Sequence, residues 1–319
     1  MDALQLTHLL KLKAFALGFQ LAGVASAIPV PNTDHYLEWL SKGYAGEMSY
    51  LIRRKAERLD PSLILPNVKF VFCVAISYAP KPAYSCRLEK NPISCYAWGQ
   101  DYHEVVGEKL EDLCNYLKLL HPQCHAKWYV DTGPILEKNY AANAGLGWIG
   151  KNTLLLNAHY GSFLFLGEIL TDGDLVPDQP VTSLCGSCNL CITSCPTGAL
   201  EDEQQLNSNK CISYLTLEHR SEFVPSPNLH NYLAGCDICQ TVCPYNSNAP
   251  STSEEAFNAR EAILNLDLAS AEDLKPDQFK NFTRHSSLSR IKYPMWRRNI
   301  QAVQNHTHSN QLNNRQDSF

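Results

Sequence analysis

The pattern of apolar and polar positions over the first 180 residues predicts a mixture of helices and strands. Leucines at helical spacing, with lysines between them, predict an amphipathic N-terminal helix, and two later segments share this period of about 3.6 residues. The predicted helices cover 6–17, 35–40 and 102–120. Short apolar runs predict buried strands at 21–30, 68–77, 126–131 and 162–170. Alternating helices and strands are typical of layered folds, so we expect an α/β or α+β fold class.

The composition changes after residue 180, and this divides the chain into three predicted segments. Residues 171–180 are rich in turn-forming residues and predict a linker. Eight of the 13 cysteines follow within the next segment, and the last segment begins acidic but has no acidic residue from 278 to 316. We therefore expect domains at 1–180, 181–250 and 251–319.

The overall composition is that of a globular protein. Hydrophobic residues make up 45% and charged residues 18%, and the net charge of −5 argues against a general nucleic-acid coat protein. Lys11 and Lys13 before an apolar stretch would also suit a secretory signal, but the helical spacing favours a folded helix. No apolar run approaches the roughly 18 residues of a membrane span. We expect a cytoplasmic protein, a monomer, with no membrane partner.

Two cysteine runs predict a ferredoxin-like module. CGSCNLCITSCP has the spacing of bacterial ferredoxins, in which three thiolates bind one cubane cluster and the cysteine before proline binds another. CDICQTVCP lacks one nearby ligand, which Cys211 can supply. The predicted 4Fe–4S ligand sets are Cys185, Cys188, Cys191 and Cys243 for the first cluster, and Cys195, Cys211, Cys236 and Cys239 for the second. Two structural zinc sites are the alternative.

The stretch GLGWIG (145–150) spells the G-x-G-x-x-G pattern of dinucleotide-binding turns. In those folds the pattern follows a strand and opens a helix. Here a helix-like segment precedes it, and the bulky Trp148 and Ile149 suit a strand or a loop better. We therefore expect these glycines to let the backbone pass close to a flat group or to another chain segment.

About 180 residues precede the cysteine module, more than an electron carrier needs. Among them, VDTGPILEKNYAANAGLGWIGKNTLL (130–155), followed by the double cysteine run, is similar to the epoxyqueuosine reductase family. GEMSYLIRRKAERLDP (46–61) and YAWGQDYH (96–103) resemble earlier motifs of that family, so the resemblance covers about residues 1–300. Its members are cobalamin-dependent iron–sulfur enzymes related to reductive dehalogenases.

The resemblance implies a function in tRNA modification. The first segment would be a cobalamin-binding catalytic core that reduces epoxyqueuosine to queuosine at the wobble position of tRNA with a GUN anticodon, the last step of queuosine biosynthesis. Electrons would pass singly from an unidentified electron donor through the clusters to cobalamin. Many relatives continue into a HEAT-like extension, and we expect a short form without one. A dehalogenase-like reductase of small molecules and a ferredoxin-type carrier are the alternatives.

The same resemblance implies that Asp131 is the catalytic acid. It follows a predicted buried strand, and a carboxyl shielded from water can keep its proton near neutral pH. The alternative is that Asp131 caps the turn at 132–134. Residues 101–107 also spell D-x-H-x-x-G, a cobalt-binding motif of other cobalamin proteins. We expect Asp101 to cap a helix there instead, and cobalamin to bind without its own base and without His103 below the cobalt.

Seven residues are the predicted cobalamin contacts. They are Arg54, Cys95, Asp131, Lys151, Asn152, Ser162 and Ser213. For most of them the alternative is ordinary: a solvated helix face for Arg54, loop packing for Lys151 and Ser162, and an incidental thiol for Cys95.

A basic strip near the C-terminus is the predicted tRNA-binding surface. Its residues are Arg284, Arg290, Lys292, Arg297 and Arg298. Basic residues beside an otherwise acidic body would confine phosphate binding to one place, and Tyr293 and Trp296 could stack on unpaired bases. The alternative is a solvated C-terminal helix.

Overall fold

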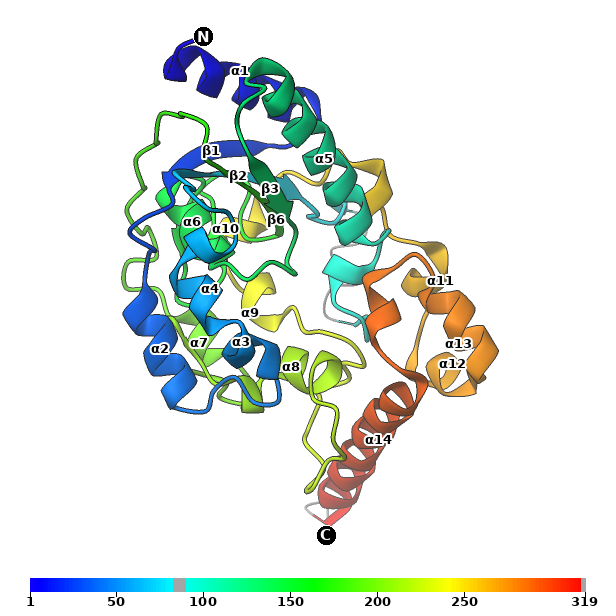
Figure 1. Cartoon of the computed structure of the whole chain (residues 1–319). Helices are drawn as coiled ribbons and strands as arrows, with labels where there is room; N and C mark the ends of the chain where they lie inside the picture. The colour runs from blue at the N-terminus through cyan, green and yellow to red at the C-terminus, as the bar shows by residue number, and fades with distance from the viewer. Residues whose placement is uncertain (83–89, 317–319) are drawn as a thin grey trace.

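The fold is built around a four-stranded sheet whose neighbouring strands are antiparallel (Figure 1). The computed structural model describes residues 1–82 and 90–316, with side chains up to residue 306. The strands, in sheet order, are β1 (Leu21–Ser26), β2 (Phe70–Ser77), β6 (Leu164–Thr171) and β3 (Ala126–Tyr129). All four strands lie in the predicted apolar runs. Because they pair in antiparallel fashion, the expected mixed fold is of the α+β type.

Helices cover both faces of the sheet (Figure 1). On one face lie α1 (Ala3–Ala16) and α5 (Tyr102–Leu120), both at predicted positions, and α6 (Glu137–Asn143) packs on the other. Alternate residues of a strand point to opposite faces, so β2 contributes to two core clusters. Phe72, Val74 and Ile76 belong to the first cluster, and Val71, Cys73 and Ala75 belong to the second.

The remaining elements are short, apart from the last helix. In the first half these are α2 (Thr33–Ser41), α3 (Ser49–Arg53), α4 (Lys55–Leu59), η1 (Pro61–Leu63), η3 (Cys95–Ala97), and the β4 (Trp148–Ile149)–β5 (Leu155–Leu156) hairpin. The cysteine module contains α7 (Leu190–Thr193), β7 (Leu200–Asp202), β8 (Gln205–Leu206), η4 (Ser208–Lys210), α8 (Ile212–Leu217), α9 (Ile238–Thr241) and α10 (Pro244–Ser247). The C-terminal segment contains η5 (Glu255–Phe257), α11 (Glu261–Leu264), α12 (Leu268–Asp273), α13 (Pro276–Thr283), η6 (Ser287–Arg290) and α14 (Tyr293–Gln316).

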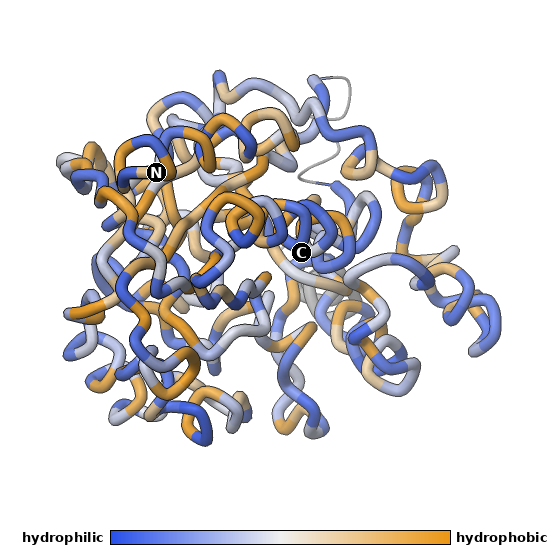
Figure 2. Tube along the Cα trace, turned by 45° about the horizontal axis from the view of Figure 1, so that its top comes forward, coloured by the Kyte–Doolittle hydropathy of each residue, from blue (hydrophilic) through white to orange (hydrophobic). Residues whose placement is uncertain are grey.

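One apolar core connects the three predicted segments. The first core cluster runs from Leu6 in α1 through Ile212 in α8 to Trp296 in α14. In Figure 2 the apolar parts of the trace lie mainly inside the molecule, and hydrophilic residues dominate the outer loops. The division at residues 180 and 250 stays a prediction.

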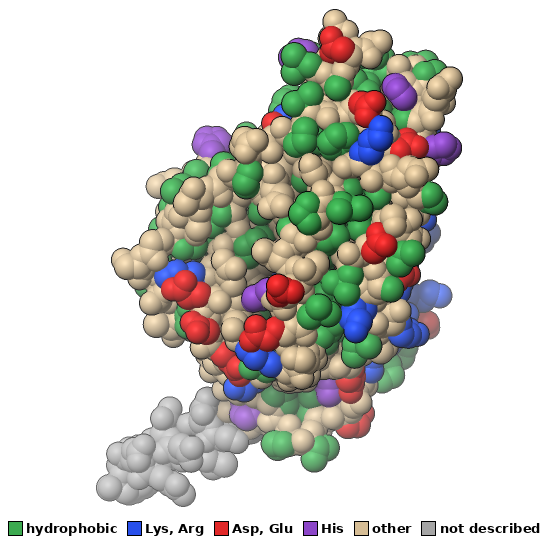
Figure 3. Space-filling model, turned by 60° about the vertical axis from the view of Figure 1, so that its left-hand side comes forward, with side chains coloured by type: hydrophobic (Ala, Val, Ile, Leu, Met, Phe, Trp, Pro, Cys, Tyr) green, Lys and Arg blue, Asp and Glu red, His purple; other side chains and the backbone are tan. Residues whose placement is uncertain are grey.

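The surface mixes side chains of both charges. On the face shown in Figure 3, acidic and basic side chains are interspersed with apolar ones. Among the described residues, no helix is long and apolar enough to cross a membrane.

The glycine stretch 145–150 follows helix α6 and leads into strand β4, so its surroundings differ from those of a dinucleotide-binding turn. A Cβ atom at Gly147 would lie 2.0 Å from the carbonyl oxygen of Leu156, and one at Gly145 would lie 2.7 Å from that of Gln179. The expected close passage of the backbone against another chain segment is confirmed.

We expect Gly147→Ala to lower the free energy of unfolding by about 1–3 kcal/mol or more, because backbone must move to admit the methyl group. Denaturant titration measures this change. Gly43→Ala is the matched control: a Cβ there meets open space, and the φ of +70° costs about 1 kcal/mol. Equal losses in the two variants would contradict the steric explanation.

Candidate functional site

Each of two cavities in the cysteine module is walled by four cysteines. Cys185, Cys188, Cys191 and Cys243 line a cavity of about 180 Å³. Cys195, Cys211, Cys236 and Cys239 line a second cavity of about 240 Å³. These are the two ligand sets that the spacing predicts, and each surrounds far more space than one metal ion fills.

The chemistry of these thiols fits a polynuclear cluster. Burial and the neighbouring thiols of Cys236 and Cys211 raise the pKa of Cys239 well above its usual value, which disfavours its thiolate form. Because metal ligands are thiolates, four thiolates this close together need a positive group between them. In the described part of the chain, no three Cys, His, Asp or Glu side chains converge on a single ion position. The cysteines stand around the cavity walls, as a cubane cluster requires.

A cleft continues from the second cysteine cavity. A neighbouring cavity of about 340 Å³ shares the lining residues Lys138, Thr153 and Leu206 with it, so the two cavities adjoin. Trp39 of α2 lines the far part, and the cysteines line the near part. A long cleft with apolar walls and scattered polar groups suits a large, flat cofactor such as cobalamin.

Only two of the predicted cobalamin contacts line this cleft, namely Asn152 and Ser213. The Nζ of Lys151 bonds Asn189 Oδ1 at 2.8 Å, and Lys151 lines the first cysteine cavity instead. Arg54 pairs with Glu57 at 3.1 Å on an exposed helix end and is not among the cleft-lining side chains. The structure therefore gives Lys151 and Arg54 partners within the protein.

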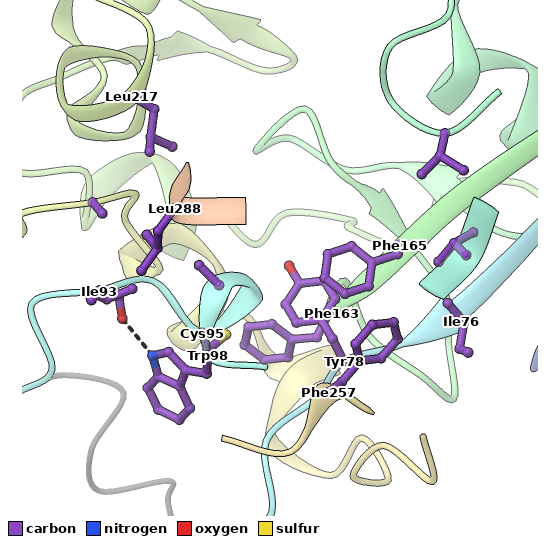
Figure 4. Packing of buried hydrophobic residues seen from close by; sticks show 14 of the residues in the cluster. Ile76, Tyr78, Ile93, Cys95, Trp98, Phe163, Phe165, Leu217, Phe257 and Leu288 are labelled. Carbon is purple, nitrogen blue, oxygen red and sulfur yellow. Dashed lines mark hydrogen bonds between the residues drawn. The ribbon is translucent and has the colours of Figure 1, made fainter. Parts of the chain in front are cut away.

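Cys95 and Ser162 lie inside the protein. Figure 4 shows Cys95 beside Trp98 in the apolar cluster, and its backbone N–H donates to Asp237 Oδ2 at 2.7 Å. The hydroxyl of Ser162 donates to Gln240 Oε1 at 2.9 Å. Both residues are at most 4% exposed, so the predicted corrin contacts of both are wrong for this structure, because neither side chain reaches the cleft.

The residues on either side of Cys95 do line the cleft. They are Ser94 and Tyr96, which the sequence analysis missed. Cys95 begins the short helix η3 with its side chain in the apolar core, so the notion that this segment borders the cleft holds for its neighbours and not for Cys95 itself.

Asp131 lies just beyond β3 in a left-handed conformation, with φ of +57°. Few residues other than glycine adopt it, and such strain often marks functional sites. The Tyr102 hydroxyl donates to Asp131 Oδ2 at 2.8 Å, and His103 Nε2 lies 3.4 Å from the same oxygen. Phe165 of β6 stacks on Tyr102 at 4.3 Å and fixes that ring. Asp131 thus belongs to a hydrogen-bonded group, here called the acid triad: Asp131, Tyr102 and His103.

The acid triad holds its proton on the histidine. Burial alone would raise the pKa of Asp131, but hydrogen bonds from His103 and Tyr102 and the charges of His103 and Arg290 outweigh burial and lower it. Burial opposes protonation of His103, yet hydrogen bonds to Asp101 and Asp131 raise its pKa to about 9. The prediction that shielding keeps Asp131 protonated is therefore wrong here, because a better base lies beside it.

His103 has no free ring nitrogen in this arrangement. Its Nδ1 lies 2.7 Å from Asp101 and its Nε2 faces Asp131. Asp101 also accepts from the backbone N–H of His103 at 3.0 Å and caps α5. The predicted helix cap is confirmed, and the histidine serves the acid triad.

An ion pair missed by the sequence analysis lies near the acid triad. Arg290 of η6 binds the carboxylate of Glu218 at the end of α8. The positive charge of Arg290 acts on both Asp131 and Tyr96. Arg290 is therefore paired within the protein and acts through its charge on Asp131 and Tyr96.

The predicted tRNA strip is partly buried. Arg298 is 8% exposed and donates to the carbonyl oxygens of His219, Ser221 and Leu215, so its predicted tRNA contact is wrong for this structure. Trp296 is fully buried, which removes it as a platform for bases.

The three remaining members of the strip differ in their exposure and in their hydrogen bonds. Arg297 donates to the carbonyl oxygen of Glu272 at 2.6 Å. Next to the strip, the hydroxyl of Tyr293 donates to the carbonyl oxygen of Leu274. Arg284 and Lys292 are exposed.

Comparisons with known proteins agree on one family. The family model described as epoxyqueuosine reductase QueG, DUF1730, matches residues 58–132, and a 4Fe-4S double cluster binding domain matches 184–246. The chain is 39% identical to an epoxyqueuosine reductase of Gloeobacter violaceus, covering 92% of this chain and 94% of that protein. It is 37% identical to one of Salmonella typhimurium, covering 94% and 80%.

Solved structures give the same result. An epoxyqueuosine reductase with an epoxyqueuosine-modified tRNA-Tyr stem loop has a TM-score of 0.81 and 32% identity, covering 94% of this chain and 80% of that chain. A Bacillus subtilis epoxyqueuosine reductase with its catalytic aspartate loop swung out of the active site has a TM-score of 0.79 and 31% identity, covering 94% and 81%.

We expect Cys191→Ser and Cys236→Ser each to lower the iron content of anaerobically purified protein by about half, from about eight iron atoms per chain, because each removes a ligand of one cluster. Iron and sulfide analysis measures this. Cys114→Ser, in buried α5, is the control and should keep all its iron. Stoichiometric zinc in place of iron would contradict the assignment.

The His103 charge should make stability depend on pH. Because the folded pKa of about 9 exceeds the ordinary 6.5, the stabilisation is fully present below pH 6.5 and is lost as the pH rises through about 9. Thermal unfolding of wild type and His103→Gln should therefore converge over this window. The control is Tyr102→Phe, because the pKa of Tyr102 lies well above this range. A His103→Gln difference that is constant with pH would refute the charged histidine.

Proposed function

Because this chain belongs to the epoxyqueuosine reductase family, we propose that it reduces epoxyqueuosine to queuosine in tRNA with a GUN anticodon. The observation that carries the proposal is the sequence of groups along one cleft. The second set of cysteines lines its near part, together with Tyr96, whose ring lies 6.3 Å from that of Tyr102 in the acid triad. The proton donor thus lies next to a residue of the wall that the cluster cysteines share.

The cofactors of this reaction are cobalamin and two 4Fe–4S clusters. When bound, they supply the two electrons singly and a low-valent cobalt centre. The two cysteine sets hold the clusters, and Asn152 and Ser213 line the cleft where they can bind the amide groups of a corrin. The apolar walls of the cleft exclude water from the reacting atoms.

The acid triad delivers a proton to the departing oxygen. Asp131 presents its carboxyl to the substrate, Tyr102 orients that carboxyl, and His103 supplies the proton at neutral pH. The swung-out aspartate loop of the B. subtilis relative supports a role for this loop in the reaction of that enzyme.

The substrate is the anticodon region of tRNA, as in the stem-loop complex of the relative. The exposed Arg284 and Lys292 are the residues that we assign to phosphate binding, and Arg290 is paired with Glu218. The same proposal places the enzyme in the cytoplasm as a monomer, with a separate protein as electron donor.

We expect Asp131→Asn to lower kcat by about 10²- to 10⁴-fold with little change in cluster content, because a general acid is lost. Mass spectrometry of nucleosides from modified tRNA, incubated with reconstituted protein, cobalamin and a reductant, measures this rate. Asp178→Asn is the control, since Asp178 pairs with Lys11 at 2.6 Å and accepts from the backbone N–H of Val24 at 2.8 Å, and it lines neither cavity of the cleft. No queuosine with wild type would contradict the proposed function, and full activity of Asp131→Asn would contradict the role of this residue.

A further inference from the structure

Glu168 is an acid in the interior of the sheet that the reaction described above does not use. It lies in β6 between Tyr129 of β3 and Cys73 of β2, and it is 1% exposed. Neither of its carboxyl oxygens has a hydrogen-bond partner of good geometry among the described residues. An unpaired buried carboxylate is very unfavourable, so this side chain must be a neutral acid.

The groups around Glu168 provide no positive charge. Glu137 faces it from α6, which packs on β6, and Asp131 lies in the loop that leads to α6. Lys138 turns away, and its Nζ donates to the carbonyl oxygen of Thr153 at 2.8 Å. In the described parts of the chain, neither Glu168 nor Glu137 forms an ion pair. Cys73 and Tyr129 complete the row across the sheet.

Electrostatics agree with this geometry. Burial, with the charges of Glu137 and Asp131, raises the pKa of Glu168 well above its usual value. Burial and the charge of Asp131 raise the pKa of Glu137 to about 8, although Lys138, His103 and the backbone N–H of Asp131 act in the opposite direction. Burial and both glutamates raise the pKa of Cys73, which stays a neutral thiol. Two acids next to an ionised Asp131 are thus protonated at neutral pH.

We propose that Glu168 and Glu137 form an internal proton store that recharges Asp131 during the reaction. The inference rests on the proposed function. Conversion of an epoxide to an alkene and water consumes two electrons and two protons: both C–O bonds break, and the oxygen leaves as water. The reduced metal cofactors supply the electrons. His103 supplies the first proton through Asp131, and the second passes from Glu137 to Asp131 as Glu168 reprotonates Glu137.

The second proton would need an internal source once tRNA and cofactor cover the cleft. Asp131 has a half-exposed side chain in this structure, and water can recharge it only while the cleft is open. The stored proton lies behind Asp131, on the side of the sheet covered by α6. This position keeps the stored proton apart from the substrate.

Infrared spectroscopy of the holoenzyme tests whether the proton is stored. We expect carbonyl bands of protonated carboxylic acids at neutral pH that are sensitive to D₂O, weaker in Glu168→Gln, and weaker still in the double variant Glu168→Gln/Glu137→Gln. Asp172→Asn, which removes an acid at the end of β6 bound to His125, is the control and should keep the bands. Absence of the bands from the wild type would overturn the proposal.

Steady-state kinetics test whether the stored proton is used. Glu168→Gln should lower kcat by at least about tenfold and leave the KM for tRNA unchanged, and Glu168→Asp should restore part of the rate. Wild-type kcat should fall as the pH rises through about 8, and Glu137→Gln should lack this limb. Circular dichroism and iron content show that the variants fold.

The outcomes separate the two proposals. A band in the wild type with an unchanged kcat in Glu168→Gln would overturn the proton store while queuosine formation upholds the proposed function. A band without any queuosine formation by wild type would overturn the proposed function and, with it, the use of the stored proton.

Discussion

The pairing of β6 with both β2 and β3 is the constraint on which the site depends. β6 places Phe165 against Tyr102 on one face of the sheet and Glu168 under α6 on the other. β3 ends beside it, so Asp131 emerges where the first turn of α5 begins. Loss of this antiparallel register by one residue would exchange the two faces and separate the acid triad.

Electrostatic crowding recurs in the cleft and needs compensation. Burial and the neighbouring thiols raise the pKa of Cys211, Cys236 and Cys239 in the second cavity, and a cationic cluster would relieve that repulsion. At the other end, three carboxyls lie close together, and only Asp131 is ionised because His103 and Arg290 act on it. The crowded thiols and the crowded carboxyls thus lie in two separate places, with Tyr96 of the cavity wall near Tyr102 of the acid triad.

Arginines near the C-terminus contribute to folding as well as to recognition. Arg298 satisfies three carbonyl oxygens and stacks on Phe223 at 4.0 Å, which anchors α14 to the cysteine module. A charge buried in this way is tolerated because its hydrogen bonds are satisfied. Arg290 forms an ion pair with Glu218, and its positive charge lowers the pKa of Asp131. A basic stretch in the sequence therefore contains residues of three different kinds: structural, ion-paired and exposed.

The sequence by itself predicted the strands of the sheet, several helices and two sets of cysteines as cofactor ligands. Local periodicity predicted the four strands of the sheet and helices α1 and α5, and cysteine spacing predicted the sets that line two cavities, because these patterns act over a few residues. Only the tertiary structure decided which side of a segment faces the cleft: Tyr96 and not Cys95, Asn152 and not Ser162. It also decided where protons reside, because the pKa of Asp131 depends on His103 and Glu137, which meet it only after folding.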